Sequence, residues 1–220
     1  MLTFVMTSGF AQTKEERNVS SFTGVAVSLS ADVQLTQGSP QRVVIEASEN
    51  DLENIVTVVR GGILEIKREP LWRGNLKNVT IWITMPEVDA LNLSGSASIL
   101  AERALTADEL EIKVSGSGKI DLRELKGNEL SIIISGSGNV NLAGMADEMD
   151  IALSGSGGVR AQSLTVSECS VRISGSGNCD VDATDELEAR ISGSGRITYY
   201  SNPEVDASVS GSGRITKGNN

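Results

Sequence analysis

The chain offers few of the side chains that usually catalyse reactions or bind metals. It contains two cysteines, Cys169 and Cys179, and no histidine. Histidine is the commonest general base and the commonest metal ligand. Its absence disfavours an activated thiol nucleophile or a zinc site at the cysteines. We therefore expect no catalytic residue, no metal site and no cofactor.

The two cysteines lie on the side of their strands that we predict to face inward. They occupy the positions that Leu110 and Ile120 fill in an earlier repeat, and the pattern places them symmetrically about Gly175 and Gly177. In an exported protein, two such thiols facing each other are compatible with a disulfide. Two small buried hydrophobic residues explain the same pattern equally well, so both interpretations stay open.

Acidic and basic residues near the repeated glycines raise a second kind of chemistry. They are Asp121, Asp150, Asp180, Asp182, Arg160 and Arg196. A polysaccharide lyase built on a β-helix would need clustered acids for calcium and an Arg or Lys base. The outward column beside the glycines has no such cluster, since it reads Lys119, Asn139, Gly158, Asn178, Arg196 and Arg214. This face is therefore interpreted as solvated, and the enzyme remains an alternative hypothesis.

Serines are the most distinctive candidates for binding. They recur as two outward ladders, in which stacked hydroxyls are available to a bound sugar or to one another. Small polar residues that merely fit an outward corner are the simpler explanation. The candidate binding residues are Ser115, Ser117, Ser135, Ser137, Ser154, Ser156, Ser174, Ser176, Ser192 and Ser194, with Ser94, Ser96, Ser210 and Ser212 continuing the ladders.

The elements that position these serines follow from a repeat. The tetrapeptide SGSG begins at residues 115, 135, 154, 174, 192 and 210, and the variant SGSA begins at residue 94. A regular period near 20 residues is typical of a solenoid, in which each repeat buries its apolar face against its neighbours. A flexible Gly/Ser linker would not keep apolar alternation on both flanks.

The alternation identifies the solenoid as β. In residues 109–122 the apolar residues and the glycines share one parity, namely Leu110, Ile112, Val114, Gly116, Gly118, Ile120 and Leu122. A period of 2 is typical of a strand. Paired inward glycines then mark a corner where a narrow tube folds and no side chain fits. The predicted corner glycines are Gly116, Gly118, Gly136, Gly138, Gly155, Gly157, Gly175, Gly177, Gly193, Gly195, Gly211 and Gly213.

We thus predict an all-β fold, a right-handed parallel β-helix of about seven rungs with polar connections such as residues 123–129 and 182–186. Three segments are expected: a signal-peptide remnant and leader (1–18), a wider β subdomain (19–88) and the SGSG solenoid (89–220).

Residues 19–88 carry several local signals. Segment 29–33 resembles a looser rung, Gly61-Gly62 indicates a hairpin turn, and residues 48–54 suit one helical turn. Trp72 and Trp82 are expected in a larger core that covers the first end of the rod. At the other end, the polar tail is too short to cover the last rung, which makes that end a candidate for self-association.

The composition of the chain disfavours some classes of binding partner. A net charge of −10 disfavours nucleic acid and anionic lipid. Residues 1–11 resemble the apolar core and cleavage site of a signal peptide without its basic start, and no later run is long enough for a membrane span. We expect an exported protein, in the periplasm, at the outer membrane surface or outside the cell.

The chain resembles the DUF2807 family of bacterial secreted proteins, described as auto-transporter adhesin head (GIN) domains. The resemblance rests on residues 22–38, 43–67 and 78–97 and on the following SGSG rungs. It implies a β-helix-like protein in the periplasm or at the cell surface, and it brings no catalytic or binding residues. The leading hypothesis is a non-enzymatic adhesin or binding scaffold for a surface glycan or a protein. A pectinase-like enzyme and a structural envelope component are the alternatives.

Overall fold

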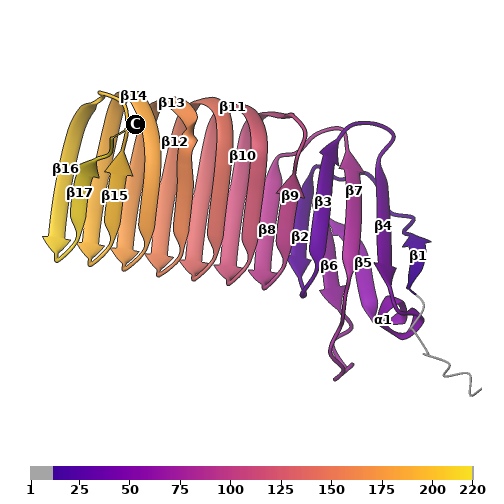
Figure 1. Ribbon diagram of the computed structural model, residues 1–220. Coiled ribbons are helices and arrows are strands. Elements are labelled where there is room, and N and C mark those ends of the chain that lie inside the picture. The colour runs from indigo at the N-terminus through magenta and orange to yellow at the C-terminus, as the bar shows by residue number, and fades with distance from the viewer. Residues whose placement is uncertain (1–11, 220) are drawn as a thin grey trace, which may run out of the picture.

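The computed structural model describes residues 12–219. Nearly all elements are β-strands, which stack along an elongated rod with one short helix at its N-terminal end (Figure 1). All the strands belong to one hydrogen-bonded network. The predicted all-β solenoid of stacked parallel strands is therefore confirmed.

The strands are β1 (Thr13–Glu16), β2 (Gly24–Ser28), β3 (Asp32–Gln37), β4 (Arg42–Ala47), β5 (Ile55–Arg60), β6 (Ile63–Arg68), β7 (Thr80–Met85), β8 (Ala90–Gly95), β9 (Ser98–Ala101), β10 (Leu105–Gly116), β11 (Lys119–Gly136), β12 (Asn139–Gly155), β13 (Gly158–Gly175), β14 (Asn178–Gly193), β15 (Arg196–Tyr199), β16 (Glu204–Gly211) and β17 (Arg214–Lys217). The helix α1 spans Glu49–Glu53.

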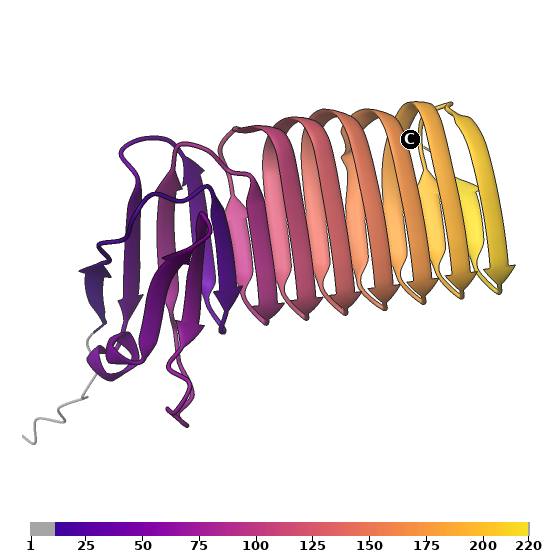
Figure 2. The same ribbon diagram turned by 180° about the vertical axis from the view of Figure 1, so that it is seen from behind.

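Each turn of the rod has two walls that meet at a crease. One wall contains β8, β10, the later halves of β11–β14, and β16; the other contains β9, the first halves of β11–β14, β15 and β17. Figure 2 shows the creases aligned along one edge of the rod. Every SGSG segment pairs in register with the next, so each crease lies directly on its neighbour.

The opposite edge of the rod differs from the expectation. The polar segments 123–129 and 182–186 were expected to connect strands, but they lie within β11 and β14. The ladder continues around this bend with shifts of register, for example between Leu122 and Leu125. Neighbouring turns of similar shape offer backbone partners all the way round, so the strands do not need to end.

The interior is a thin aliphatic layer. Its side chains come from alternate positions of both walls, and residues such as Ile112, Ile120 and Ile132 have 0% exposure. Full burial of one such side chain stabilises the fold by about 1.5–3 kcal/mol. The buried residues form one continuous cluster from the N-terminal strands to the last covered turn, so the rod has a single core.

The N-terminal part continues the same stack. β2 and β3 pair in parallel with β8 and β9, which confirms that they form an early rung with residues 29–33 at its corner. β6 and β7 form the next layer on β2 and β3. Three strands then pair antiparallel: β5 with β6, β4 with β7, and β1 with β4. This antiparallel layer and α1 cover the first end of the rod (Figure 2).

Two local predictions for this region are confirmed. Gly61 and Gly62 form the β5–β6 turn with φ values of 56° and 78°, as a type I′ hairpin requires. The predicted helical turn is α1, whose N-cap Ser48 accepts a hydrogen bond from the Asp51 backbone N–H at 3.2 Å.

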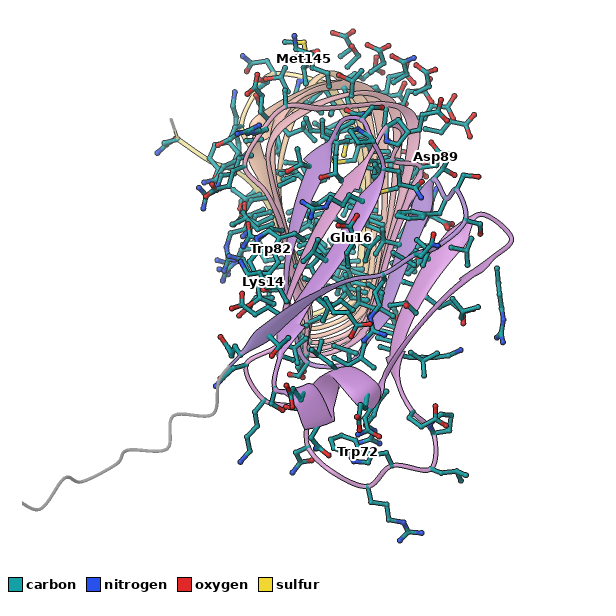
Figure 3. All side chains as sticks on the ribbon, turned by 90° about the vertical axis from the view of Figure 1, so that its right-hand side faces the viewer. Lys14, Glu16, Trp72, Trp82, Asp89 and Met145 are labelled. Carbon is teal, nitrogen blue, oxygen red and sulfur yellow. The ribbon has the colours of Figure 1, made fainter. Side chains whose placement is uncertain are left out.

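The prediction that both tryptophans belong to a core is wrong. Trp82 lies on the outer face of β7, where the Lys14 ammonium sits 4.3 Å from its ring centroid. Trp72 lies in the loop between β6 and β7 and packs against Gly74. Both side chains are labelled in Figure 3, away from the interior of the rod. The core stays aliphatic because the inward positions of β7 are Ile81, Ile83 and Met85.

The leader predicted for residues 1–18 overlaps β1. Its apolar part, residues 1–11, lies outside the described residues. Residues 13–16 form an exposed, charged edge strand on β4. Within residues 12–219, no helix is long and apolar enough to cross a membrane.

Candidate functional site

The first glycine of each SGSG owes its place to backbone conformation. Gly95, Gly116, Gly136, Gly155, Gly175, Gly193 and Gly211 all have φ between 120° and 134°, a region that side-chain-bearing residues avoid. A Cβ on Gly116 would lie only 2.7 Å from the carbonyl oxygen of Gly95 in the preceding turn. Its missing side chain therefore points along the rod, onto the neighbouring crease.

The second glycine owes its place to lack of space. Gly118 is buried, and a Cβ there would lie 3.0 Å from both the Ala97 carbonyl oxygen and the Leu93 side chain. At Gly195, a Cβ would lie 2.8 Å from the side chain of Ile173. The sequence interpretation gave both glycines an inward position and one role. The structure separates them, because only the second glycine faces the interior.

The serine ladders line the outside of the crease. Ser115 and its equivalents from Ser94 to Ser210 are exposed and stack in register. In the second ladder, from Ser117 to Ser212, the backbone N–H of each serine donates to the carbonyl oxygen of the first glycine in the preceding turn, for example Ser137 to Gly116 at 2.8 Å. In the described part of the chain, the Ser94 hydroxyl donates a hydrogen bond to the hydroxyl of Ser28, at the end of β2, at 2.8 Å. Most of these hydroxyls therefore point to solvent.

A ladder of glutamates on the adjoining wall was missed by the sequence analysis. Six glutamates stack directly on one another, one per turn, and all are exposed: Glu109, Glu129, Glu148, Glu168, Glu186 and Glu204. Parallel strands lie about 4.8 Å apart. None of the six has an ion pair within residues 12–219.

The signal for this ladder was present in the sequence. Each of the six glutamates stands six residues before the first serine of its SGSG. The parity of a strand shows only that these glutamates face outward, as many other residues do. They also lie outside the SGSG segments, on which the sequence interpretation concentrated.

The two columns between the glutamates and the serines partly neutralise each other. The acidic column reads Glu111, Ser131, Asp150, Ser170, Glu188 and Asp206, and the next reads Lys113, Ile133, Ala152, Arg172, Arg190 and Ser208. Ion pairs join them at Lys113–Glu111 (2.6 Å), Arg172–Glu188 (2.7 Å) and Arg190–Asp206 (2.7 Å). Hydrogen bonding to Arg190 holds the pKa of Asp206 below its usual range.

The acidic residues line a groove of 590 Å³ at one end of the glutamate ladder. Its lining is Asp89, Asp108, Glu109, Leu110, Glu111, Glu129, Leu130, Ser131, Glu148 and Asp150. Figure 3 shows Asp89 on the outer side of the rod, near the N-terminal strands. In residues 12–219, no three acidic or thiol side chains converge as metal ligands would. Asp150, considered with the crease carboxylates in the sequence, belongs to this groove instead.

The remaining crease carboxylates and bases are dispersed. Asp121 pairs with Lys119 at 3.2 Å, and Asp182 accepts hydrogen bonds from Thr165 and Ser201. Arg160 donates to Asn141 at 3.3 Å. The Lys119–Asp121 pair lies within one turn, the Asp182 and Arg160 contacts join neighbouring turns, and none of them gathers acids around one point.

Both cysteines are buried free thiols in the structure. Cys169 is in register with Met149 and Leu187, and Cys179 is in register with Val159. Burial raises the pKa of both thiols, that of Cys179 to about 12. The symmetric placement inferred from the sequence is wrong: Cys169 lies six residues before Gly175, whereas Cys179 lies two after Gly177. The Cys179 thiol is nevertheless close enough to Cys169 to contribute, after burial, to the raised pKa of the Cys169 thiol.

The chain is similar to known proteins in both sequence and structure. A family model described as "Putative auto-transporter adhesin, head GIN domain" (DUF2807) matches residues 21–203. A comparison with curated proteins finds no match.

Three solved structures share the fold over nearly the whole chain. A "putative adhesin" from Bacteroides fragilis NCTC 9343 has 23% identity and a TM-score of 0.85, covering 96% of this chain and 98% of that one. A "putative lipid binding protein" from Parabacteroides distasonis ATCC 8503 has 25% identity and a TM-score of 0.76, with coverage of 94% and 96%. A "putative adhesin" from Parabacteroides merdae ATCC 43184 has 23% identity and a TM-score of 0.75, with coverage of 94% and 96%. Because the family model spans most of the sequence, the chain belongs to the DUF2807 family.

Proposed function

We propose that this protein is a non-enzymatic adhesin, exported to the periplasm or the cell surface, that uses its rod as a binding scaffold. Family membership supports the adhesive role. The observation that carries the proposal is the register of the outward residues. The first serine of each SGSG and the glutamate six residues before it recur once per turn, so the rod presents these two side chains several times in a row.

Such repetition suits a ligand that itself repeats, on a glycan or on a protein surface. Several weak contacts made together give an avidity far above that of one contact. The serine ladders are the proposed contact edge, because their exposed hydroxyls both donate and accept hydrogen bonds. The central positions of this edge are Ser135, Ser154 and Ser174.

Binding of the purified chain to a glycan array and to immobilised surface proteins tests this function. The informative variant replaces Ser135, Ser154 and Ser174 by lysine, which puts three long charged side chains on the contact edge. The matched control places three lysines on the opposite bend, at Asn128, Ser163 and Thr184, which are also exposed. We expect the crease variant to lose binding and the bend variant to keep it. Equal binding by both variants would show that the serine ladders are not the contact edge. If the unmodified chain binds no ligand, the proposed adhesin function is wrong.

The acidic groove is the one observation that favours an enzyme. A polysaccharide lyase needs carboxylates, but it also needs a base, and the lining of the groove contains neither lysine nor arginine. Its carboxylates would also repel acidic sugars such as polygalacturonate. Incubation with acidic and neutral polysaccharides, followed by reducing-end and unsaturated-product assays, separates the two functions. Turnover that disappears in Glu129→Gln would establish the enzyme and overturn our proposal.

A further inference from the structure

The last turn of the rod has an open side. β16 pairs with β14 and β17 pairs with β15, and no strand within residues 12–219 pairs with their outer edges. All eight residues of β16 are exposed. Its inward side chains include Val205 and Val209, which are 37% and 42% exposed, whereas the equivalent Leu187 and Ile191 are 0% and 3% exposed. Apolar surface and an unpaired strand edge therefore coincide.

Among residues 12–219, the unpaired backbone N–H and C=O groups of β16 belong to Val205, Ala207 and Val209, whose side chains face inward. In an earlier turn, the N–H of Glu111 donates back to the Asp89 carbonyl at 2.9 Å, and Asp206 occupies the position of Glu111 in the last turn. Because N–H and C=O groups alternate in direction along a strand, those of Val205, Ala207 and Val209 point to the open side. An exposed edge of this kind is a template for another strand.

We propose that two copies of this protein join end to end, with β16 of one copy paired antiparallel to β16 of the other about a two-fold axis at Ala207. In this register Val205 lies opposite Val209 of the second copy, and Ala207 lies opposite itself. Every inward apolar residue meets an inward apolar residue, so the core continues across the junction. The spacing Val-x-Ala-x-Val is the same in both directions, which an isologous contact requires.

Charge supports this register. The two-fold axis places Glu204 opposite Ser210 of the second copy and Asp206 opposite Ser208. The glutamate ladder therefore ends at a serine rather than at another carboxylate, which removes one like-charge contact. Asp206 is already paired with Arg190 at 2.7 Å. The other end of the rod lacks this self-complementarity. Its edge strand β1 carries only polar side chains, and its edge strand β5 has the spacing Ile-x-Thr-x-Val, which differs in the two directions.

The mass of the full chain in solution is the first test. Light scattering over a range of concentrations should show a monomer–dimer equilibrium. Val209→Lys puts a charge on the junction and should shift the protein to monomer at every concentration. Val58→Lys is the matched control, since it changes the edge strand β5 at the opposite end and should leave the dimer intact. Thermal melting of both variants shows that the rest of the rod is folded.

Pairwise cross-linking tests the register. In the proposed dimer, residue 206 of one copy faces residue 208 of the other with the Cα atoms about 4.5 Å apart, within disulfide range. A mixture of Asp206→Cys and Ser208→Cys proteins should form a disulfide-linked heterodimer on oxidation. Neither variant alone should form a cross-linked dimer. Its two identical cysteines are offset by two residues along the strands, which adds about 7 Å to their separation. Oxidation of the unmodified chain measures how much cross-linking its buried native thiols cause.

The possible results are distinct. A monomer at all concentrations, a dimer that Val209→Lys leaves unchanged, or cross-links within a single variant would each overturn the proposal. The junction lies at the end of the rod, outside the central serine positions tested above, so loss of the dimer and loss of ligand binding are separate outcomes.

Discussion

Glu148 lies directly opposite Glu168 in the parallel ladder of β12 and β13, and Glu129 lies opposite Glu148 on its other side. All three carboxylates are exposed, and within residues 12–219 none of them has an ion pair. In the neighbouring column, Arg172 and Arg190 pair with Glu188 and Asp206. The six glutamates have no such partners in residues 12–219 and form a line of like charge along the rod.

Neutralising one glutamate in the middle of this line should stabilise the fold. Like charges directly opposite each other on a sheet cost about 0.2–1 kcal/mol, and Glu148 has such a neighbour on both sides. We expect Glu148→Gln to raise the free energy of unfolding by about 0.5–1 kcal/mol in low salt. High salt screens exposed charges and should abolish most of the gain. Thermal melting at several ionic strengths measures both effects.

Glu87→Gln is the control for this substitution. Glu87 is exposed in the segment between β7 and β8, outside the ladder, and should change stability little. If the two variants behave alike in low salt, the like-charge interpretation of the ladder is wrong.

The period and parity of the SGSG repeat were sufficient to predict the rod. They identify the rungs, the creases and the inward residues, because a narrow parallel stack imposes the same requirement at each turn. They do not reveal that the two glycines of a crease have different roles. Gly116 is required by its backbone conformation and Gly118 by lack of space, and both requirements select glycine. Only the backbone angles and the neighbouring atoms distinguish those causes.

Other features depend on contacts that local patterns do not encode. Trp82 stands at an outward position of β7, and its partner Lys14 comes from β1, which joins the sheet through β4. The glutamate ladder becomes visible only when equivalent positions of different repeats are compared with one another. A search for acids six residues before each SGSG would have found it.

The first glycine of a crease can be compared with an ordinary glycine. Gly136 has φ of 124°, and a Cβ there would lie 2.8 Å from the Gly116 carbonyl oxygen. Strained backbone of this kind costs about 1–3 kcal/mol, so Gly136→Ala should lower the unfolding midpoint clearly. At Gly38 a Cβ would meet only Thr84, at 3.7 Å, so Gly38→Ala should be nearly neutral. Urea unfolding followed by circular dichroism measures both, and similar losses would contradict a special role for the crease.

The contact between Lys14 and Trp82 should hold β1 on the sheet. An exposed cation–π pair contributes about 0.5–1 kcal/mol, and among residues 12–219 the edge strand β1 pairs with β4 alone. We expect Lys14→Met to speed amide hydrogen exchange in residues 13–16 and to change the fluorescence of Trp82. Lys126→Met, at the far bend, serves as the control. Unchanged exchange at β1 would show that its backbone bonds to β4 suffice.

The buried thiols should make stability fall at high pH. Burial raises the pKa of Cys179 from 9.0 to about 12 and also raises that of Cys169. Above pH 9 the unfolded chain loses thiol protons that the folded chain keeps, so the unfolded state binds fewer protons and is favoured as pH rises. The stabilisation is complete below pH 9 and should fall by about 1.4 kcal/mol per thiol at pH 10.

Cys179→Val removes one of these thiols and keeps the core apolar, because valine fills the equivalent position at Val159. Urea unfolding at pH 8 and pH 10 should show a smaller decrease for this variant than for the unmodified chain, while the ionisation of lysines and tyrosines affects both proteins equally. Both native thiols should also resist iodoacetamide at pH 8 until the protein is unfolded, since the thiolate is the reactive form. Rapid alkylation of the folded chain, or an identical decrease in the two proteins, would mean that the thiols are not held protonated in the core.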